Sequence, residues 1–502
     1  MDTITHHRDS HQGFWNLQGS LLNKHILLWV LFAFTTIVIY RLPKEVDFLF
    51  IVTVFIFFAR SRQNYFWLAY FILLSYAPFG LFTEGTRDAA YRLPLFSLGP
   101  GLSFSTLQIF LFIGFVKALM VQHEVRSYFV AHYKVLLIYV GFLALVAILV
   151  HDTSLGNFIS GLKLAFNLSF FFIIYKLIYE REEKYKFISL LIPFGFLILL
   201  DAFYFLITSG DYIYNFFNPI EPRETGGLGL EASAVNIRFE VRGFILSYLI
   251  FIFSLSYYFI SKNKYYFLLA ALSAFIVILV GSLRSWFVVY TLALIFFMFY
   301  SSERIKHIIV IGVLVLGLLI PVLNSSSGSA ALSGAFTRIG TVFSLGKESS
   351  AATQQIEGKI TKRLPSQLQY IRENPLTGWA FTEKESDGDV GNIGLIVEGG
   401  FVGFIIFIWF WLTYINILRK HIKILKSPHA RKVLKMLIVM FLGTLLSHFT
   451  TNRMFGFFGG YFIGILVFFT EFILDEVKLN EQLHELETDA TQVQTSDVGH
   501  TG

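Results

Sequence analysis

The chain of 502 residues is 55% hydrophobic and only 15% charged, with a formal net charge of +6. A soluble protein of this length needs far more charge to cover its surface, so the composition excludes an ordinary soluble domain. Cysteine is absent, which excludes disulfides, thiolate metal sites and a cysteine nucleophile. The positive charge fits basic loops held against anionic lipid, so we expect membrane lipids and no nucleic acid as partners.

Apolar runs recur along the whole chain, and about 20 apolar residues suffice to cross a bilayer as a helix. Residues 1–24 lack the features of a signal peptide and are predicted to form a cytoplasmic N-terminus. Two of the runs are short, and merging one adjacent pair would give twelve, so we predict an all-α polytopic membrane protein with about 12–14 transmembrane helices. The fourteen candidate runs are 25–41, 46–60, 65–82, 104–121, 133–150, 158–179, 187–208, 242–261, 265–281, 284–300, 306–323, 391–417, 432–450 and 455–474.

Positive residues are distributed unevenly between these runs. With the loops numbered alternately from a cytoplasmic N-terminus, 20 Lys and Arg residues fall in the inner connections and nine in the outer ones, leaving out the long connection 324–390. Cytoplasmic loops are enriched in Lys and Arg, so both termini are predicted to be cytoplasmic. Transmembrane helices are then expected over 25–323 and 391–474. A cytoplasmic tail, 475–502, would follow, with a short amphipathic start and a disordered end.

Two outer connections, 209–241 and 324–390, are too long to be simple turns. Within the second, apolar residues recur at helical spacing, which predicts a short amphipathic helix in an extracytoplasmic loop. These residues are Ile360, Leu364, Leu368 and Ile371. Such a helix would lie on the outer membrane face or cover a cavity, or it is a surface helix without a function.

Arg284 is the most unusual residue of the apolar segments, because a cation at the centre of a membrane helix costs about 3 kcal/mol. Arg238 and Arg242 are four residues apart and would share one helix face. Both, together with Arg363, fall on the predicted outer side. Arginine binds pyrophosphate through two parallel hydrogen bonds, so these four residues predict a site for an anionic lipid head. The alternative is that each snorkels at the interface or pairs with an acid such as Glu240.

Other polar residues in the spans carry less information. His151, His421 and His448 have no second ligand at helical spacing, so no metal site is predicted. Asp201 is a lone acid within a predicted span and is a functional candidate by default, although it could simply pair with a neighbouring helix.

The stretch from Arg372 to Phe407 contains the sequence NPLTG and, after a loop, an Asn-to-Gly stretch that opens a predicted span. This arrangement resembles the signature of the O-antigen ligase and Wzy-type polysaccharide polymerase superfamily. In that family an amphipathic helix with an early Arg leads into an N-P-L-x-G turn, and an H-N-x-x-L-x-x-x-x-E-x-G motif opens a membrane helix. The residues that correspond are Arg363, residues 374–378, Asn392, Leu395 and Glu398, with Gly400 in the second glycine position, although two residues instead of four separate Leu395 from Glu398.

Two arginine contexts extend the resemblance. GSLRSW, around Arg284, is similar to a Ser-Arg context at the outer end of a family span. RFEVRG, from Arg238 to Gly243, is similar to an Arg-x-x-x-Arg-Gly stretch that opens another. The resemblance implies a GT-C-like membrane glycosyltransferase of the bacterial cytoplasmic membrane, with arginines on the pyrophosphate. Undecaprenyl-pyrophosphate-linked glycan would be both donor and acceptor, no cofactor would be needed, and a flippase and a chain-length regulator are candidate partners.

One position departs from the family pattern. Gly391 stands where the ligases have a His that is taken to assist the acceptor hydroxyl. We therefore expect a polymerase of O-antigen, capsule or exopolysaccharide repeats rather than a ligase, with Asp389, Asn392 and Glu398 as catalytic residues. Asp389 would accept the hydroxyl proton and Glu398 would hold the site in shape. The alternative for Asp387 and Asp389 is that they are solvated loop acids.

A transporter is the main alternative to an enzyme. A lipid-linked oligosaccharide flippase would also have about 12–14 helices and a cationic cavity, but it would show two similar halves. No repeat between the halves is visible here, and the arginines fall on one predicted side. The enzyme is therefore the favoured interpretation.

Overall fold

The structure is a computed structural model, and some residues, among them Arg284 and Asn392, are described by their backbone alone. It describes residues 19–41, 43–76, 96–97, 103–104, 106–122, 128, 130–208, 244–280, 284–301, 303–325, 329, 364–382, 392–447 and 459–498. Asp389, Arg238, Arg242 and Arg363 lie outside these ranges.

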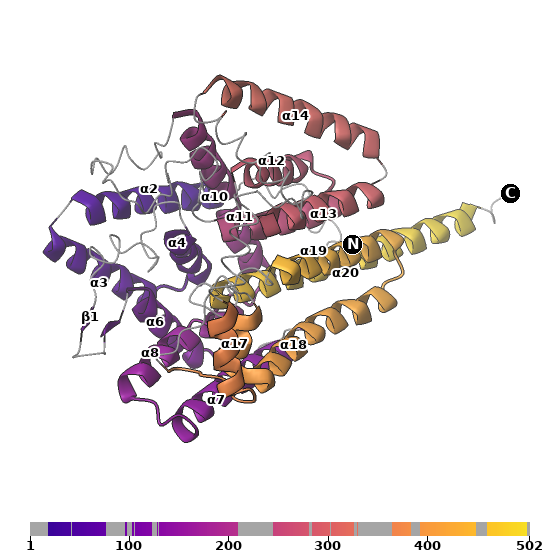
Figure 1. Cartoon of the computed structure of the whole chain (residues 1–502). Helices are drawn as coiled ribbons and strands as arrows, with labels where there is room; N and C mark the ends of the chain where they lie inside the picture. Colours follow the sequence, from indigo (N-terminus) through magenta and orange to yellow (C-terminus); the bar gives the residue numbers. More distant parts are fainter. Residues whose placement is uncertain are drawn as a thin grey trace.

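The described chain is helical apart from one pair of two-residue strands, which confirms the all-α class (Figure 1). The strands β1 (Phe96–Ser97) and β2 (Ser103–Phe104) pair antiparallel. The helices are α2 (Gly19–Arg41), α3 (Lys44–Arg60), α4 (Asn64–Tyr76), α6 (Thr106–Met120), α7 (Val130–Leu149), α8 (Leu155–Phe166), α9 (Ser169–Leu177), α10 (Arg181–Thr208), α11 (Phe244–Ser261), α12 (Lys264–Val280), α13 (Arg284–Tyr300), α14 (Arg304–Asn324), α17 (Leu364–Glu373), α18 (Asn392–Ile424), α19 (Pro428–Ser447) and α20 (Gly459–Val498).

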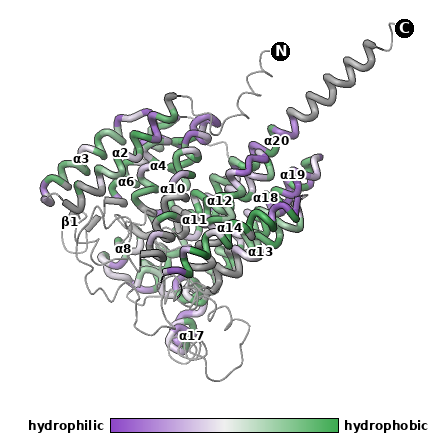
Figure 2. Tube along the Cα trace, turned by 90° about the horizontal axis from the view of Figure 1, so that it is seen from above, coloured by the Kyte–Doolittle hydropathy of each residue, from purple (hydrophilic) through white to green (hydrophobic). Residues whose placement is uncertain are grey.

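Three helices of the described chain are long and apolar enough to cross a membrane. They contain His132–Leu149, Arg304–Asn324 and Ile393–Ile424. Apolar side chains also face outward, as on α14, where Ile305, Val313 and Leu316 are 76%, 64% and 64% exposed. Figure 2 shows hydrophobic residues along most of the described helices. Such a surface suits contact with lipid rather than water.

Aromatic residues fill much of the interior between the helices. Phe58 of α3 and Phe71 of α4 each stack on Phe110 of α6, with ring centroids 4.2 Å apart in both pairs. Phe71 also contacts Phe170 of α9 at 6.2 Å. Rings bury large apolar areas and prefer such defined geometries, so these contacts hold α3, α4, α6 and α9 together.

The prediction of one span over 158–179 is wrong, because the chain bends between α8 and α9. At this bend the Phe170 N–H donates to the Asn167 carbonyl and the Phe171 N–H to the Leu168 carbonyl, both at 3.2 Å. These bonds close turns tighter than those of an α-helix. Asn is a weak helix former, which favours a bend here. The surrounding residues are apolar and do not predict the bend.

Helix α20 also differs from expectation. The helix expected to end at residue 474 continues without interruption to Val498, through a polar segment for which only a short amphipathic start and then a disordered end were expected. This part of α20 extends past the neighbouring helices (Figure 1). Its first residues have few turn-forming or helix-breaking side chains, so a helix already started by packing can continue.

Charged residues tie α10 to α20. Arg181 donates two hydrogen bonds to Glu476 Oε1, from Nε at 3.0 Å and from Nη2 at 2.7 Å. Lys184 Nζ lies 3.5 Å from both Glu471 Oε1 and Asp475 Oδ2. Glu471 and Glu476 are buried, so losing a basic partner would leave a carboxylate uncompensated inside the protein.

Glu183 lies beside these ion pairs without a partner of its own. Its Oε2 is buried and has no hydrogen-bond partner among the described residues. Burial first, and then repulsion from Glu180, raises the pKa of Glu183 from its ordinary 4.5 to about 7. The neighbouring Lys186 pairs with Glu182 at 2.5 Å.

We expect Glu183→Gln to stabilise the protein in a pH-dependent way. Since the pKa is raised by folding, the carboxylate costs no stability below about pH 4.5, and its full cost appears above about pH 7. Thermal unfolding in detergent should therefore show a higher Tm for Glu183→Gln at pH 8 and little change at pH 4.5. Glu182→Gln is the control, because the Glu182 side chain is 72% exposed. An equal Tm shift at both pH values would contradict the assignment.

Candidate functional site

Helix α18 is broken at Gly400, whose φ of 62° and ψ of −168° are not helical. A break leaves the last carbonyls of the first half and the first N–H groups of the second half without helical partners. In an apolar environment each such group costs several kcal/mol unless it is bonded elsewhere. The site is built where these groups are satisfied.

The turn that follows α17 supplies the missing partners. The Phe401 N–H donates to the Pro375 carbonyl at 2.8 Å, and the Val402 N–H donates to the Leu376 carbonyl at 3.2 Å. In the other direction, the Trp379 N–H donates to the Val397 carbonyl at 2.7 Å. The turn 374–378 and the break in α18 are thus joined as one backbone unit, which we call the turn–break junction.

Two glycines make this close approach possible. Gly378 has φ of 68°, and a Cβ added there would lie 2.4 Å from the Gly400 nitrogen and 2.6 Å from the Glu398 carbonyl oxygen. A Cβ on Gly400 would lie 2.2 Å from the Leu376 carbonyl oxygen. Both positions need a positive φ and also lack room for a side chain, so each requires glycine.

Glu398 lies at the end of the first half of α18, two residues before the break, and it is half-buried. The following residue, Gly399, faces α7, where an added Cβ would meet Leu143 at 3.4 Å and the Tyr139 hydroxyl at 3.6 Å. Tyr139 is buried and interacts electrostatically with Glu398. Glu398 therefore lies close to both the break and α7.

His151, from the chain just after α7, reaches the same junction. Its Nε2 lies 2.6 Å from the Gly378 carbonyl oxygen, and its ring stacks on Trp379 with centroids 4.9 Å apart and planes 19° from parallel. The Trp379 indole is fixed in turn, because its Nε1–H donates to the Tyr370 carbonyl at 2.9 Å. No functional role was predicted for His151 from the sequence. Its place directly after a predicted span, in an outer connection, was the available signal.

The face that α17 turns toward the protein differs from the predicted one. Gln367 is buried, whereas Leu368, expected on the apolar face, is 40% exposed. The orientation follows from the end of the helix, where Asn374 N–H donates to the Tyr370 carbonyl at 3.2 Å and the turn enters the α18 break. The packing of the turn against α18 thus determines which face of α17 is buried, more than the spacing of apolar residues along α17 does.

Of the seven predicted site residues, only Glu398 has a described side chain. Asn392 is the first residue of α18 and Arg284 the first residue of α13. Tyr248 of α11 contacts both neighbouring helices. Its ring centroid lies 5.4 Å from that of Tyr290 on α13, and its hydroxyl donates to the Met440 carbonyl of α19 at 3.0 Å. The start of α13 therefore lies beside the end of α19, which runs antiparallel to it.

Helix α18 also runs antiparallel to α19 and packs against it. The Trp411 ring lies 4.2 Å from the Phe441 ring, and the two helices are joined by a short connection. The end of α19 thus points toward the break in α18. The backbone of Arg284 and the turn–break junction accordingly lie at the same end of the bundle, whereas Asp389, Arg238, Arg242 and Arg363 lie outside the described residues.

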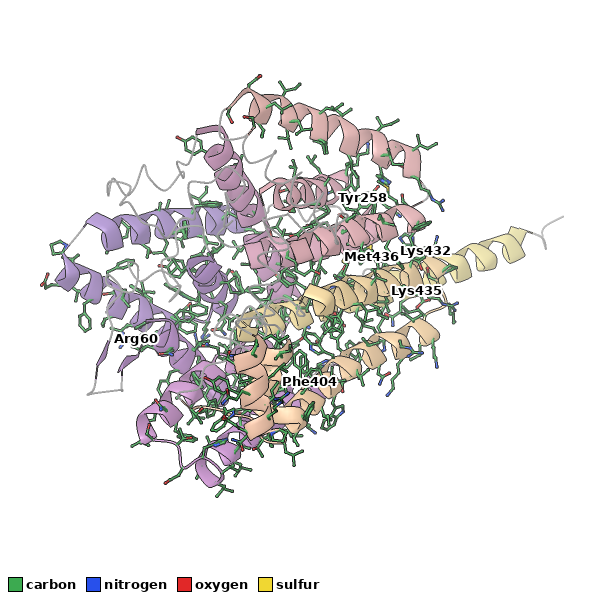
Figure 3. The ribbon with its side chains drawn as sticks, in the orientation of Figure 1. Arg60, Tyr258, Phe404, Lys432, Lys435 and Met436 are labelled. Atoms are coloured by element: carbon green, nitrogen blue, oxygen red, sulfur yellow. The ribbon has the colours of Figure 1, made fainter. Side chains whose placement is uncertain are left out.

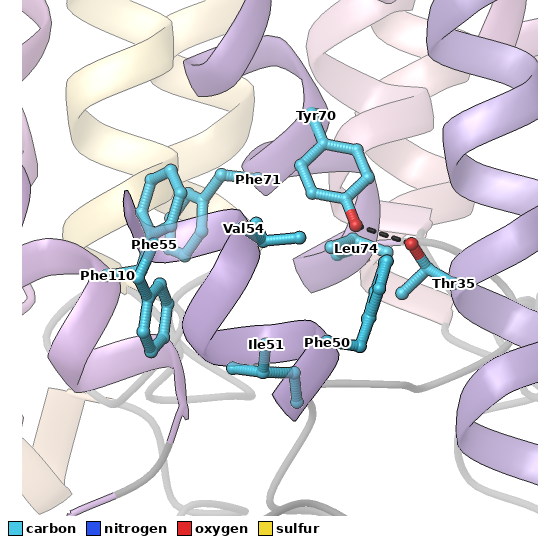
Figure 4. A pocket seen from close by; sticks show the side chains of 9 residues that line it. All are labelled: Thr35, Phe50, Ile51, Val54, Phe55, Tyr70, Phe71, Leu74 and Phe110. Atoms are coloured by element: carbon cyan, nitrogen blue, oxygen red, sulfur yellow. Dashed lines mark hydrogen bonds between the residues drawn. The ribbon is translucent and has the colours of Figure 1, made fainter. Parts of the chain in front are cut away.

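A small apolar pocket lies apart from the junction, among α2, α3, α4 and α6 (Figure 4). Its one polar feature is a hydrogen bond of 2.5 Å between Thr35 Oγ1 and the Tyr70 hydroxyl. The lining residues carry no charge, so the pocket cannot hold an anion. The described residues also contain no group of three or more His, Asp or Glu side chains that could bind a metal ion.

The chain matches no known protein-family model, and a comparison with curated proteins finds no relative. The resemblance to the ligase and polymerase superfamily therefore rests on the residues themselves.

We expect Gly400→Ala and Gly378→Ala to disrupt the junction, because each adds a methyl group where backbone atoms already touch at a positive φ. The strain should cost about 1–3 kcal/mol at each site and lower Tm and activity together. Gly312→Ala on α14 is the matched control, since an added Cβ there meets nothing within 4 Å. A Gly400→Ala variant with wild-type Tm would show that the break is not held in this way.

Proposed function

We propose that the protein is a membrane glycosyltransferase that polymerises undecaprenyl-pyrophosphate-linked oligosaccharide repeats at the outer leaflet of the bacterial cytoplasmic membrane. The observation that carries the proposal is the turn–break junction. The two sequence motifs that resemble the superfamily, NPLTG and the stretch containing Glu398 and Gly400, lie side by side and are joined, within or directly after each motif, by three backbone hydrogen bonds. Motifs that meet in this way are more informative than two short sequence matches.

The distribution of charge supports the proposed side of the membrane. Lys432 and Lys435, near the start of α19, lie at a different end of the bundle from Phe404, which follows the break in α18 (Figure 3). Lys262, between α11 and α12, and Lys306, at the start of α14, also lie in or next to short connections that are rich in basic residues. Because basic connections face the cytoplasm, we infer that both termini are cytoplasmic and that the junction faces the outer leaflet.

Discontinuous helices suit this role. Irregular backbone at membrane depth is tolerated where it lines a cavity or is buried in protein, and the helix ends there present unpaired dipoles. In α18 the break places Glu398 at such an end. The long connections 209–241 and 324–390 would bring the proposed pyrophosphate ligands to it from the outer side.

The proposed reaction joins two lipid-linked chains. An acceptor hydroxyl oxygen forms a bond to C1 of the donor sugar, and the bond from C1 to the pyrophosphate oxygen breaks, with its electron pair leaving on the undecaprenyl pyrophosphate. Arg238, Arg242, Arg284 and Arg363 would stabilise the negative charge on that leaving group. Pyrophosphate is already a good leaving group, so the proposed mechanism requires no metal.

The hydroxyl proton must pass to a base at the site. The sequence offers Asp389 for this step, with Asn392 and Glu398 orienting the acceptor and holding the site in shape. The absence of the family's His at position 391 favours polymerisation over ligation.

Arg284→Lys should lower polymerisation roughly tenfold to a hundredfold, because lysine keeps the charge but loses the paired hydrogen bonds to the pyrophosphate. The measurement is the length distribution of surface glycan in cells that express each variant at equal level. Arg60→Lys is the matched control, since Arg60 is an exposed residue at the end of α3 (Figure 3). Normal glycan length in Arg284→Lys would count against the role of this residue.

Deletion of the gene separates the candidate functions in the same assay. A polymerase predicts single repeats on the lipid anchor. Accumulation of lipid-linked polymer that is never transferred would instead indicate a ligase, and cytoplasmic accumulation of lipid-linked repeats would indicate a flippase.

A further inference from the structure

His151 is fixed at the turn–break junction by three separate constraints. Asp152, the next residue, has a φ of 44°, and the Thr153 N–H donates to the Ala147 carbonyl at 3.1 Å, so the chain turns sharply as α7 ends. The imidazole then lies flat on Trp379 and meets the Gly378 carbonyl through Nε2. The stacking fixes the plane of the ring and the contact with Gly378 fixes its rotation.

The contact with Gly378 determines which nitrogen of the neutral imidazole carries the proton. A carbonyl oxygen can only accept a hydrogen bond, so Nε2 must carry the hydrogen that it shares with Gly378. In neutral imidazole only one ring nitrogen is protonated, and Nδ1 is then a proton acceptor. Among the described residues Nδ1 has no hydrogen-bond partner.

Several titratable or charged residues lie on the elements around this nitrogen. The titratable and charged residues on the elements that meet near it include Asp152 beside it, Tyr139 on α7, Lys163 on α8, Glu398 on α18, and Tyr370, Arg372 and Glu373 on α17. Imidazole is the only one of these side-chain types that ordinarily exchanges its proton between pH 5 and 8.

We propose that His151 is the catalytic base of the site and that Nδ1 takes the proton from the acceptor hydroxyl. The inference rests on the proposed polymerase function and replaces Asp389 in the role of base. The hydroxyl oxygen forms the new bond to C1 while its proton moves to Nδ1. The resulting imidazolium keeps its Nε2–H bond to Gly378, and the proton is later released to water.

His151→Gln tests this role with little disturbance to the fold. The glutamine amide nitrogen takes the position of Nε2 and can still donate to Gly378, but the variant has no basic nitrogen. Reconstituted full-length protein should keep its Tm and its KM for lipid-linked repeats, while kcat falls about 100-fold or more. The wild-type loss of rate toward acid pH should disappear, and added imidazole should restore part of the rate.

His429→Gln is the matched control, because its Nε2 also meets a backbone carbonyl, that of Phe259, at the end of the bundle that carries Lys432. Its rate and pH profile should equal those of the wild type.

A His151→Gln variant with a wild-type rate and pH profile would overturn the inference, as would an acid limb lost in Asp389→Asn but kept in His151→Gln. Polymer formed by the wild type in either case would leave the proposed function standing. A wild-type protein that forms no polymer would refute the function itself.

Discussion

The hydrogen-bonding demand of a broken helix in an apolar environment is the constraint on which the site depends. Once α18 is interrupted at Gly400, its freed carbonyl and N–H groups must find partners outside the helix. The turn after α17 meets that demand through three backbone bonds. The turn and the break pack so closely that neither Gly378 nor Gly400 has room for a side chain.

The position of each functional group follows from this fit. Glu398 is the second residue before the break, so the break sets its depth and direction. Trp379 follows the turn, and its indole is anchored on α17 by the Tyr370 carbonyl. His151 then joins α7 to the junction through the Gly378 carbonyl. The end of α7, the turn after α17 and the break in α18 thus meet at one junction, beside one carboxylate and one imidazole.

The sequence predicts where helices form, but it does not predict where a helix is interrupted. The run 284–300 matches α13 at both ends, since Arg284 and the polar residues after Tyr300 mark its limits. The break at Gly400 was not predicted, because EGGFVG lies inside a continuous apolar run and glycine is common in membrane helices. The bend near Asn167 was missed for the same reason, and only tertiary contacts distinguish it from a straight span.

The site could be predicted in part. NPLTG and Glu398 were selected by resemblance, but their contact depends on backbone conformations at Gly378 and Gly400 that no spacing rule contains. His151 lies 227 residues from Gly378, and only the packing of α7 on α18 brings the two together. The proposed arginine ligands were selected by depth and sidedness, and their role stays a prediction.

Reconstitution of the purified protein in vesicles is the most direct measurement of its central chemistry. Undecaprenyl-pyrophosphate-linked repeats would be supplied as the only substrate, and both glycan length and released undecaprenyl pyrophosphate would be measured. A polymerase predicts a ladder of chain lengths, with one lipid pyrophosphate released for each bond formed. Unchanged glycan length, with labelled lipid moved from one leaflet to the other, would show that the protein transports its substrate and does not polymerise it.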